Sequence, residues 1–561
     1  MAKKNNNKNT TLYFWLFFVL CNCFIFLPKY FLNIDITNLI SITNMSIRSV
    51  FEHVNQDFLR LSGEFFLLSS LLFFFKEKRW FSIFLTICFF LLISYQAYYE
   101  FSIRLYEQVP SFQNDYLLIR QVLPIFLSNR GIDSPIYIIS AIIVLLLAIA
   151  LGIFLVSQMI KHFRGSKKTR IIYAIIMLYH LVSFSQMPIN NRNANIQWSL
   201  PKIAQSLDTK SFEPIYLKEK KNIYSNLIQK NLVQKPNVYL LVIEAYGGLV
   251  CNTSITNNSY KENIGTVKKI LDKNGWKTTS NLSRSTIFGG RSWLGFSTIM
   301  TGMKIENQIQ YNQLLFDNND FPHMIRFFNQ QEYQTYRLST LSASKAAKKR
   351  IPQQTMHELW EYNKWLQFDD IPYHGIRYNS FGGIPDQYAL SYFNNQFTNK
   401  NNTPQFLFFI TMNSHTPWYK PPPILDNWQS FDSISNNKAT NQKSLDGSTI
   451  ERYQKTIEYE LNFITKFITE EADSNSIFIL VGDHQPAGLG HFVMENKRKF
   501  DCPIHIVSKN ENFIHAFEKY GFVEGMYADP KKVTSIRHED IYEMFTKEMI
   551  SVFGNHNSSP E

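Results

Sequence analysis

The sequence predicts a chain in two parts: an α-helical membrane domain of five spans, then an α/β domain whose mainly parallel sheet is covered by helices. Long runs of Phe, Leu and Ile fill the chain before residue 190, and an ordinary mixture of polar and apolar residues follows. In the second part, continuous apolar runs of strand length alternate with segments of helical periodicity. This alternation is typical of a parallel sheet with helices on both faces.

Five apolar segments predict the membrane domain, which covers residues 1–189. A spanning helix needs about 20 mostly apolar residues, because the hydrocarbon core is about 30 Å thick. The segments that meet this length are 12–32, 56–75, 80–99, 136–159 and 171–189.

The basic residues between these segments predict their orientation. Lys and Arg cluster at the N-terminus (MAKKNNNK), between the second and third segments (KEKR) and between the fourth and fifth (KHFRGSKKTR). With five spans all three clusters lie on one side, which the positive-inside rule identifies as the cytoplasm. Everything after residue 190 is then extracytoplasmic. No small-residue cleavage site follows the first segment, so we expect an uncleaved anchor.

The net charge of +12 excludes few classes of protein, because most basic clusters flank apolar runs and suit an anionic membrane surface. No nucleic-acid-binding motif is present, so we expect no nucleic-acid partner. Cys251 and Cys502 in the polar part could pair in an oxidising compartment, but two cysteines do not establish a disulfide framework.

The second part divides into three regions. Residues 190–235 are polar and rich in Lys, which predicts a juxtamembrane linker with a short amphipathic helix. Residues 236–550 predict one extracytoplasmic α/β domain. The polar residues 551–561 predict a disordered tail.

Three predicted core strands of this domain are each followed by residues that can bind a metal or move a proton. The run 238–243 stops at Glu244, the run 406–411 precedes His415, and the run 477–481 precedes Asp483 and His484. Ligand sites of open α/β sheets lie at the carboxyl ends of the strands. A polar residue at one strand end usually forms a turn or a cap, whereas three such ends together predict a site.

A fourth element, GGRSWLGFSTIMTG, predicts a tight turn at Gly289 and Gly290 and a helix that ends near Thr301. Ser292 stands at the helix start. A Ser at this position is most often an N-cap. The functional alternative is a Ser oxygen at the positive end of the helix dipole, where an anion such as phosphate or sulfate is stabilised.

The order of these groups resembles the alkaline phosphatase superfamily, in the branch of the sulfatases, lipoteichoic acid synthases and phosphoethanolamine transferases. The matching motifs are VIEAYG, GGRSWLGFSTIMTG, MNSHTPW and VGDHQP, within residues 236–510 and behind five predicted spans. In sulfatases the nucleophile lies nine residues before a Thr-Gly pair. Ser292 has this spacing to Thr301, which selects it over Ser285, Thr286 and Ser297.

The resemblance implies a metal-dependent enzyme. One divalent cation, Mn²⁺ or Zn²⁺ with Mg²⁺ as the alternative, is expected to be bound by Glu244, Ser292, Asp483 and His484. The catalytic residues implied are Ser292 as the nucleophile and His415 for proton transfer. The implied substrate contacts are His415, His491 and Arg291.

The implied reaction moves a phospho-group of the phosphoglycerol or phosphoethanolamine type. The donor would be a membrane phospholipid and the acceptor a cell-envelope glycan or lipid, at a bacterial inner (plasma) membrane. Hydrolysis of sulfuric or phosphoric esters is the alternative, although Ser292 lacks the following x-Pro-Ser-Arg that accompanies conversion to formylglycine in sulfatases. A third hypothesis is a non-catalytic binding domain of the same fold.

Overall fold

The computed structural model describes most of the chain in two compact units. The described residues are 2–29, 61–75, 78–106, 108–116, 135–163, 171–176, 178, 182, 196–207, 217–253, 255–317, 320–341, 358–378, 383–398, 403–434, 445–489, 492 and 498–555. One unit consists of residues 1–115 and 131–209, and the other of residues 116–130 and 210–561.

The first unit is helical, as its apolar runs predict. Its elements include α1 (Ala2–Ile25), α5 (Gly63–Ser70), α6 (Leu72–Phe75), α7 (Arg79–Tyr106), α9 (Pro135–His162), α11 (Leu200–Leu207) and the paired strands β1 (Leu61–Ser62) and β2 (Ile196–Gln197). Within the described residues, two stretches are long and apolar enough to cross a membrane, Arg79–Ile103 and Ile142–His162. They coincide with the third and fourth predicted spans, and the count of five stays a prediction.

The helix α9 carries the composition of a lipid-facing segment. Its residues 142–147 are six consecutive apolar side chains, and each is at least half exposed in the chain. In contrast, α1, α5 and α7 pack through aromatic rings, for example Phe18 against Phe65 with ring centroids 5.8 Å apart. A helix that is apolar all round and exposed suits a hydrocarbon environment better than water.

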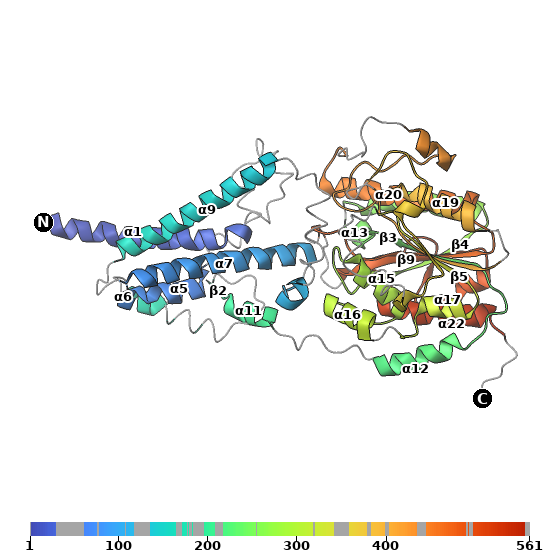
Figure 1. The fold of residues 1–561 in the computed structure, drawn as a ribbon, viewed down its shortest axis with the longest axis horizontal. Helices are drawn as coiled ribbons and strands as arrows, with labels where there is room; N and C mark the ends of the chain where they lie inside the picture. The colour runs from blue at the N-terminus through green and yellow to red at the C-terminus, as the bar shows by residue number, and fades with distance from the viewer. Residues whose placement is uncertain are drawn as a thin grey trace. The chain divides into compact units, whose positions relative to one another are not determined.

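The second unit is built on one nine-stranded sheet (Figure 1). Eight strands follow the order β10-β4-β9-β8-β3-β7-β5-β6, and β11 pairs with β4. Their bounds are β3 (Asn237–Ile243), β4 (Lys277–Arg284), β5 (Gln334–Leu338), β6 (Lys364–Leu366), β7 (Gln405–Ile410), β8 (Ser476–Gly482), β9 (Asp501–Ser508), β10 (Val523–Glu524) and β11 (Ile536–Arg537).

The sheet is mixed: the predicted parallel pairing is found at the centre and one side and again between β11 and β4, and antiparallel pairs lie between these parts. The strands β8, β3, β7, β5 and β6 run parallel. The strand β9 runs antiparallel to both β8 and β4, and β10 runs antiparallel to β4. An antiparallel neighbour needs no crossover helix, so the helix–strand alternation of the sequence does not reveal it.

Helices cover both faces of this sheet, which explains the continuous apolar runs. Tyr239 and Leu241 of β3 face a core shared with α14, α19 and α20, whereas Leu240 and Val242 face a core shared with α15, α17 and α22. Figure 1 shows α19 and α20 on one side of the strands and α15, α17 and α22 on the other. The helices are α12 (Leu217–Ile228), α13 (Leu249–Asn252), α14 (Asn257–Lys273), α15 (Ser292–Thr301), α16 (Gln308–Asp317), α17 (Met324–Gln330), α19 (Asp386–Phe397), α20 (Thr449–Glu470), α21 (Glu511–His515) and α22 (Ile541–Phe553).

Both boundaries of the predicted domain are structured. In the predicted linker, α12 packs onto the end of α15, where Lys220 and Tyr224 both donate hydrogen bonds to the Gly302 carbonyl. The helix α22 continues to Phe553, inside the predicted tail, and Gly554 forms an isolated bridge with Leu232. The α/β unit therefore includes α12 as well as the predicted domain.

Gly302→Ala is expected to destabilise the α/β unit strongly. Gly302 caps α15 with a φ of +65°, and an added Cβ would lie 2.1 Å from the Tyr224 hydroxyl oxygen. The left-handed backbone alone costs an L-residue about 1–2 kcal/mol, and the clash adds to this. Thermal unfolding of the purified variant measures the total.

The matched control is Gly275→Ala. Gly275 has a φ of +77°, but no atom of the residues that the structure describes lies within 4 Å of its added Cβ. Gly275→Ala therefore has the free-energy cost of a left-handed backbone without the steric clash. Equal losses of stability in the two variants would contradict the proposed packing of α12 against α15.

Candidate metal and nucleophile site

The register of the sheet brings two of the predicted site residues together. The strands β3 and β8 are parallel neighbours, and Ile243 pairs with Gly482 at their ends. Glu244 and Asp483 therefore leave the sheet side by side. A Cβ at Gly482 would lie 1.9 Å from the Tyr246 carbonyl oxygen, so only glycine allows this close approach.

A turn of unusual backbone conformation places Ser292 opposite these strand ends. Gly289, Gly290 and Arg291 have φ values of +31°, +68° and +61°, and α15 begins at the next residue. Left-handed backbone at the non-glycine Arg291 is costly and is found most often where function requires it. The helix also packs tightly on β8, because an added Cβ at Gly295 would lie 3.0 Å from the Asp483 carbonyl oxygen.

The Ser292 hydroxyl lies within hydrogen-bonding distance of two of the predicted metal ligands. Its Oγ is 2.9 Å from Oε2 of Glu244 and 3.0 Å from Nε2 of His484. The His484 Nε2 is also 3.2 Å from Oδ2 of Asp483 and 3.6 Å from Oε1 of Glu244. Glu244, Asp483 and His484 are buried, with ligand atoms within 4.8 Å of one another, whereas Ser292 is only half-buried.

The hydrogen bonds of His484 determine which ring nitrogen carries the proton and which one presents a lone pair to Glu244 and Asp483. Its Nδ1 is 2.8 Å from the Gln485 carbonyl oxygen, which can only accept, so Nδ1 carries the proton. In the neutral ring Nε2 is then an acceptor that faces the carboxylate oxygens of Asp483 and Glu244. Oδ1 of Asp483 accepts from the backbone N–H groups of Ala245 and His484, but Oδ2 is buried without a hydrogen-bond donor among the described residues.

This convergence of lone pairs fits a divalent cation. Buried acceptors without donors are costly, and a cation satisfies them together. Burial, and then the charge of Asp483, raises the pKa of the Glu244 carboxyl well above its ordinary value. Carboxylate oxygens and one imidazole nitrogen are the donor set of Zn²⁺ and Mn²⁺ sites.

His415 lies on the loop that follows β7, next to the same group of residues. It is half-buried, and its Nδ1 is 2.6 Å from the Thr416 carbonyl oxygen. Burial lowers its pKa to about 4, and the charges of His484 and Asp483 act on it in opposite directions. The loop is hydrogen-bonded to the residue that follows β3: Thr411 Oγ1 accepts from the Glu244 N–H, and Ser414 Oγ donates to the Glu244 carbonyl.

The remaining two predicted residues have different outcomes. Arg291 is buried, with 7% exposure, at the N-cap position of α15, next to Ser292. His491 lies outside the described residues. The structure thus brings Glu244, Ser292, Asp483 and His484 together, with Arg291 adjacent in the chain.

The sequence assigned no role to two groups of this region. Tyr453 on α20 donates a hydrogen bond to the Ala245 carbonyl, one residue after Glu244. Asp386 and Glu460 are fully buried carboxyl groups behind the His415 loop. A signal existed for Glu460, because it occupies an apolar position of α20, three residues after Ile457 and four before Ile464.

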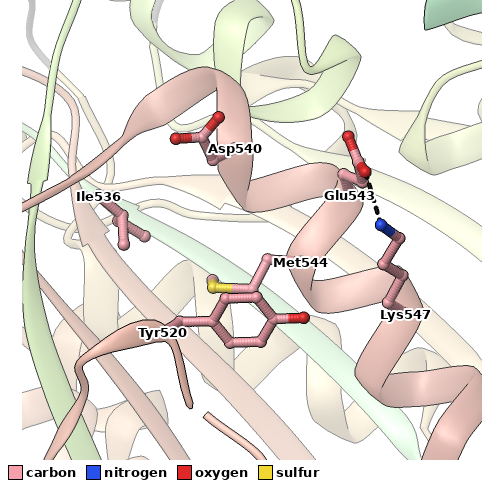
Figure 2. A pocket seen from close by; sticks show the side chains of 6 residues that line it. All are labelled: Tyr520, Ile536, Asp540, Glu543, Met544 and Lys547. Carbon is pink, nitrogen blue, oxygen red and sulfur yellow. Dashed lines mark hydrogen bonds and ion pairs between the residues drawn. The ribbon is translucent and has the colours of Figure 1, made fainter. Parts of the chain in front are cut away.

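A pocket of about 260 Å³ lies elsewhere in the α/β unit (Figure 2). Its lining residues come from the C-terminal segment and are Tyr520, Ile536, Asp540, Glu543, Met544 and Lys547. An ion pair of 2.7 Å joins Glu543 to Lys547, as the dashed line in Figure 2 shows. None of the predicted site residues that the structure describes lines this pocket. The pocket is therefore not the candidate site.

A family model described as Sulfatase matches residues 251–511, a range that contains Ser292, His415, Asp483 and His484. No curated protein sequence matches the chain significantly. The match confirms the expected resemblance to the sulfatases for this part of the chain and indicates an enzyme domain.

Three solved structures are similar to the chain. The chain is 14% identical to the integral membrane lipooligosaccharide phosphoethanolamine transferase A of Neisseria meningitidis, with 95% of each chain covered and a TM-score of 0.41. It is 16% identical to the phosphoglycerol transferase GacH of Streptococcus pyogenes, covering 62% of this chain and 88% of that one, with a TM-score of 0.35. It is 13% identical to the lipoteichoic acid synthase LtaP of Listeria monocytogenes, covering 51% and 71%, with a TM-score of 0.35.

Proposed function

A Sulfatase family model matches residues 251–511, and from this premise we propose that the protein transfers a phospho-group from a membrane phospholipid to a cell-envelope acceptor. The group is of the phosphoglycerol or phosphoethanolamine type, and the acceptor is a glycan or a lipid. One observation carries the proposal: the half-buried Ser292 hydroxyl lies 2.9 Å from Glu244 and 3.0 Å from His484, at the N-terminus of a helix. This is the environment of an activated hydroxyl that attacks an anion.

In this proposal Glu244, Ser292, Asp483 and His484 hold one divalent cation, Mn²⁺ or Zn²⁺, with Mg²⁺ as the alternative. When bound there, the cation supplies Lewis-acid polarisation of a phosphoryl oxygen and lowers the pKa of the hydroxyl. The protein's own contribution is orientation, because the proton on Nδ1 of His484 directs Nε2 into the site.

The proposed reaction has two displacements at phosphorus. The Ser292 oxygen forms a bond to phosphorus while the bond to the lipid oxygen breaks, and the leaving diacylglycerol takes up a proton. The acceptor hydroxyl then attacks phosphorus, gives up its proton and releases Ser292 with its proton restored. His415 is the proposed proton carrier, because burial keeps its ring neutral near pH 7 and able to accept a proton.

The substrate contacts are proposed for His415, Arg291 and His491. Arg291 is the residue before Ser292, and a guanidinium can bind two phosphoryl oxygens at once. The proposed setting is an inner (plasma) membrane with the N-terminus in the cytoplasm and the domain 236–550 outside. The two helices long enough to span a membrane support a membrane location for residues 1–189.

Intact-mass measurement of the full chain in detergent tests this proposal. The protein is incubated with Mn²⁺ and vesicles of either phosphatidylglycerol or phosphatidylethanolamine. The expected result is a mass gain of one phosphoglycerol or one phosphoethanolamine group with one of the two lipids. The adduct should be absent in Ser292→Ala and present in Ser297→Ala, a matched serine in the same helix.

Two other outcomes would replace the proposal. No adduct, with cleavage of soluble sulfate or phosphate esters, would make the protein an ester hydrolase. No adduct, no cleavage and no bound metal would leave a non-catalytic domain of the sulfatase fold.

A further inference from the structure

Two fully buried carboxyl groups lie behind the loop that carries His415. Asp386 is the first residue of α19, and Glu460 lies in the middle of α20. Each has 0% exposure. They approach one another from separate helices, and neither belongs to the group of proposed metal ligands. A buried acidic residue is costly unless it is paired or protonated, so the two groups require an explanation.

The Asp386 carboxyl is hydrogen-bonded to backbone N–H groups of the loop that carries His415. Its Oδ2 accepts hydrogen bonds from the N–H groups of Met412, at 2.7 Å, and Asn413, at 2.6 Å. Asn413 forms a second hydrogen bond with Asp386, in which its side-chain oxygen accepts from the Asp386 N–H at 2.8 Å. Thr340 Oγ1 lies 3.3 Å from the other carboxylate oxygen. These three donors stabilise the anion, whereas burial acts more strongly in the other direction and raises the pKa of Asp386 from 3.8 to about 7.

Glu460 has the opposite surroundings. Neither of its oxygens has a hydrogen bond of normal geometry from an N–H or O–H donor within the described residues. Its polar neighbours are the carboxyl of Asp386 and the residue Ser414. Two buried carboxyl groups in contact cannot both ionise. A proton on Glu460 resolves the conflict, since its O–H can donate to the ionised Asp386.

We propose that Glu460 and Asp386 form a proton-sharing carboxyl pair that positions the loop 411–415 and, through it, His415 and Glu244. Asp386 holds residues 412 and 413, and Glu460 holds Asp386. On its other side the loop binds the backbone N–H and carbonyl of Glu244 through Thr411 and Ser414. The pair acts as a positioning device and does not touch substrate. The inference rests on the proposed roles of His415 and Glu244.

Burial raises the pKa of both carboxyl groups of the pair. Burial, and then the charge of Asp386, raises the pKa of Glu460 well above its ordinary value of 4.5. The other titratable groups that interact with the pair are Tyr459 on α20 and Glu244 beyond the loop, and Tyr378, before α19, interacts with Tyr459. None of these groups carries a positive charge, so they do not compensate a second anion. At neutral pH the fold therefore retains the shared proton.

Amide and alanine substitutions test the pair. Glu460→Gln keeps a donor toward Asp386, and we expect adduct formation by this variant to stay within about threefold of wild type. Glu460→Ala leaves Asp386 without that donor, and Asp386→Asn replaces an acceptor with an N–H₂ group that faces two N–H donors. Misplacement of a catalytic group by about 1 Å can cost about 10²-fold in rate, which is the loss we expect for Asp386→Asn. Glu470→Gln, at an exposed site on the same helix, is the matched control.

Two readouts require no turnover, so they separate this inference from the proposed function. Infrared absorption of a protonated carboxylic acid should be present at neutral pH in wild type and weaker in Glu460→Gln, which lacks the protonated carboxyl of Glu460. The melting temperature supplies the second. A carboxyl whose pKa is raised on folding stabilises the fold at low pH, and this stabilisation is lost as pH rises above about 4.5 toward the folded pKa. The wild type should therefore lose stability relative to Glu460→Gln over that range.

The outcomes are distinct. An infrared band unchanged by Glu460→Gln, or a melting difference that does not change with pH, overturns the shared proton. Equal activity of Glu460→Gln and Glu460→Ala, with both folded, overturns the positioning role. If wild type forms no adduct with either lipid, the proposed function fails, while the infrared and melting results still decide whether the pair exists.

Discussion

Ser292→Ala is expected to lower kcat by about 10⁴-fold or more, because Ser292 is the proposed nucleophile and loss of a covalent nucleophile costs an enzyme several orders of magnitude in rate. The Ser292 oxygen is the hydroxyl that contacts both Glu244 and His484. Headgroup release from the lipid donor measures the rate, and intact mass measures the adduct. The variant should still bind the metal, since Glu244, Asp483 and His484 remain.

Neighbouring hydroxyl groups provide the controls. Ser285 donates to the Asp483 carbonyl and Thr286 to the Ile305 carbonyl, so both are engaged with backbone. Ser297→Ala, in the same helix, should keep activity close to wild type. Ser292→Thr should retain part of the activity, because a secondary hydroxyl can form the same bond. An adduct on Ser292→Ala at the wild-type rate would move the nucleophile to another residue.

Asp483→Asn is expected to have opposite effects on stability with and without metal. In the metal-free protein it removes the repulsion between Asp483 and Glu244, and it keeps an oxygen for the N–H groups of Ala245 and His484. We expect it to be more stable than metal-free wild type by on the order of 1 kcal/mol, the equivalent of about one pKa unit. Thermal unfolding in EDTA measures this.

With Mn²⁺ the order should reverse. A ligand at 100 times its dissociation constant stabilises the folded state by about 2.7 kcal/mol, and the wild type gains this whereas the variant does not. Loss of a direct ligand should lower metal affinity by more than the roughly 10–100-fold typical of an outer partner. Turnover should fall with metal content.

His484→Ala should likewise lose the metal, and His515→Ala is its control. His515 is an exposed histidine paired with Glu518, and its removal should change neither metal content nor turnover. One metal ion per chain bound by Asp483→Asn with wild-type affinity would contradict the proposed ligand set.

The local sequence was sufficient to predict the strands and the helix that position the candidate site. The predicted runs 238–243, 406–411 and 477–481 agree with β3, β7 and β8 to within one residue at each end. A strand covered on both faces must be apolar at every position, and that pattern is visible in one dimension. The helix that begins beside Ser292 was predicted for a similar local reason, from two glycines before a helical segment.

Long-range pairing decided the rest. The neighbours of β3, the antiparallel β9 and the contact between Asp386 and Glu460 join residues separated by tens to hundreds of positions. Nothing in the local pattern of α20 says which carboxyl Glu460 meets, because that depends on how α19 and the β7 loop pack against it. The sequence determined which residues end the strands and begin the helix, since burial and chain geometry act locally. Only the tertiary structure decided which of these ends meet, because strand order and helix packing are properties of the whole sheet.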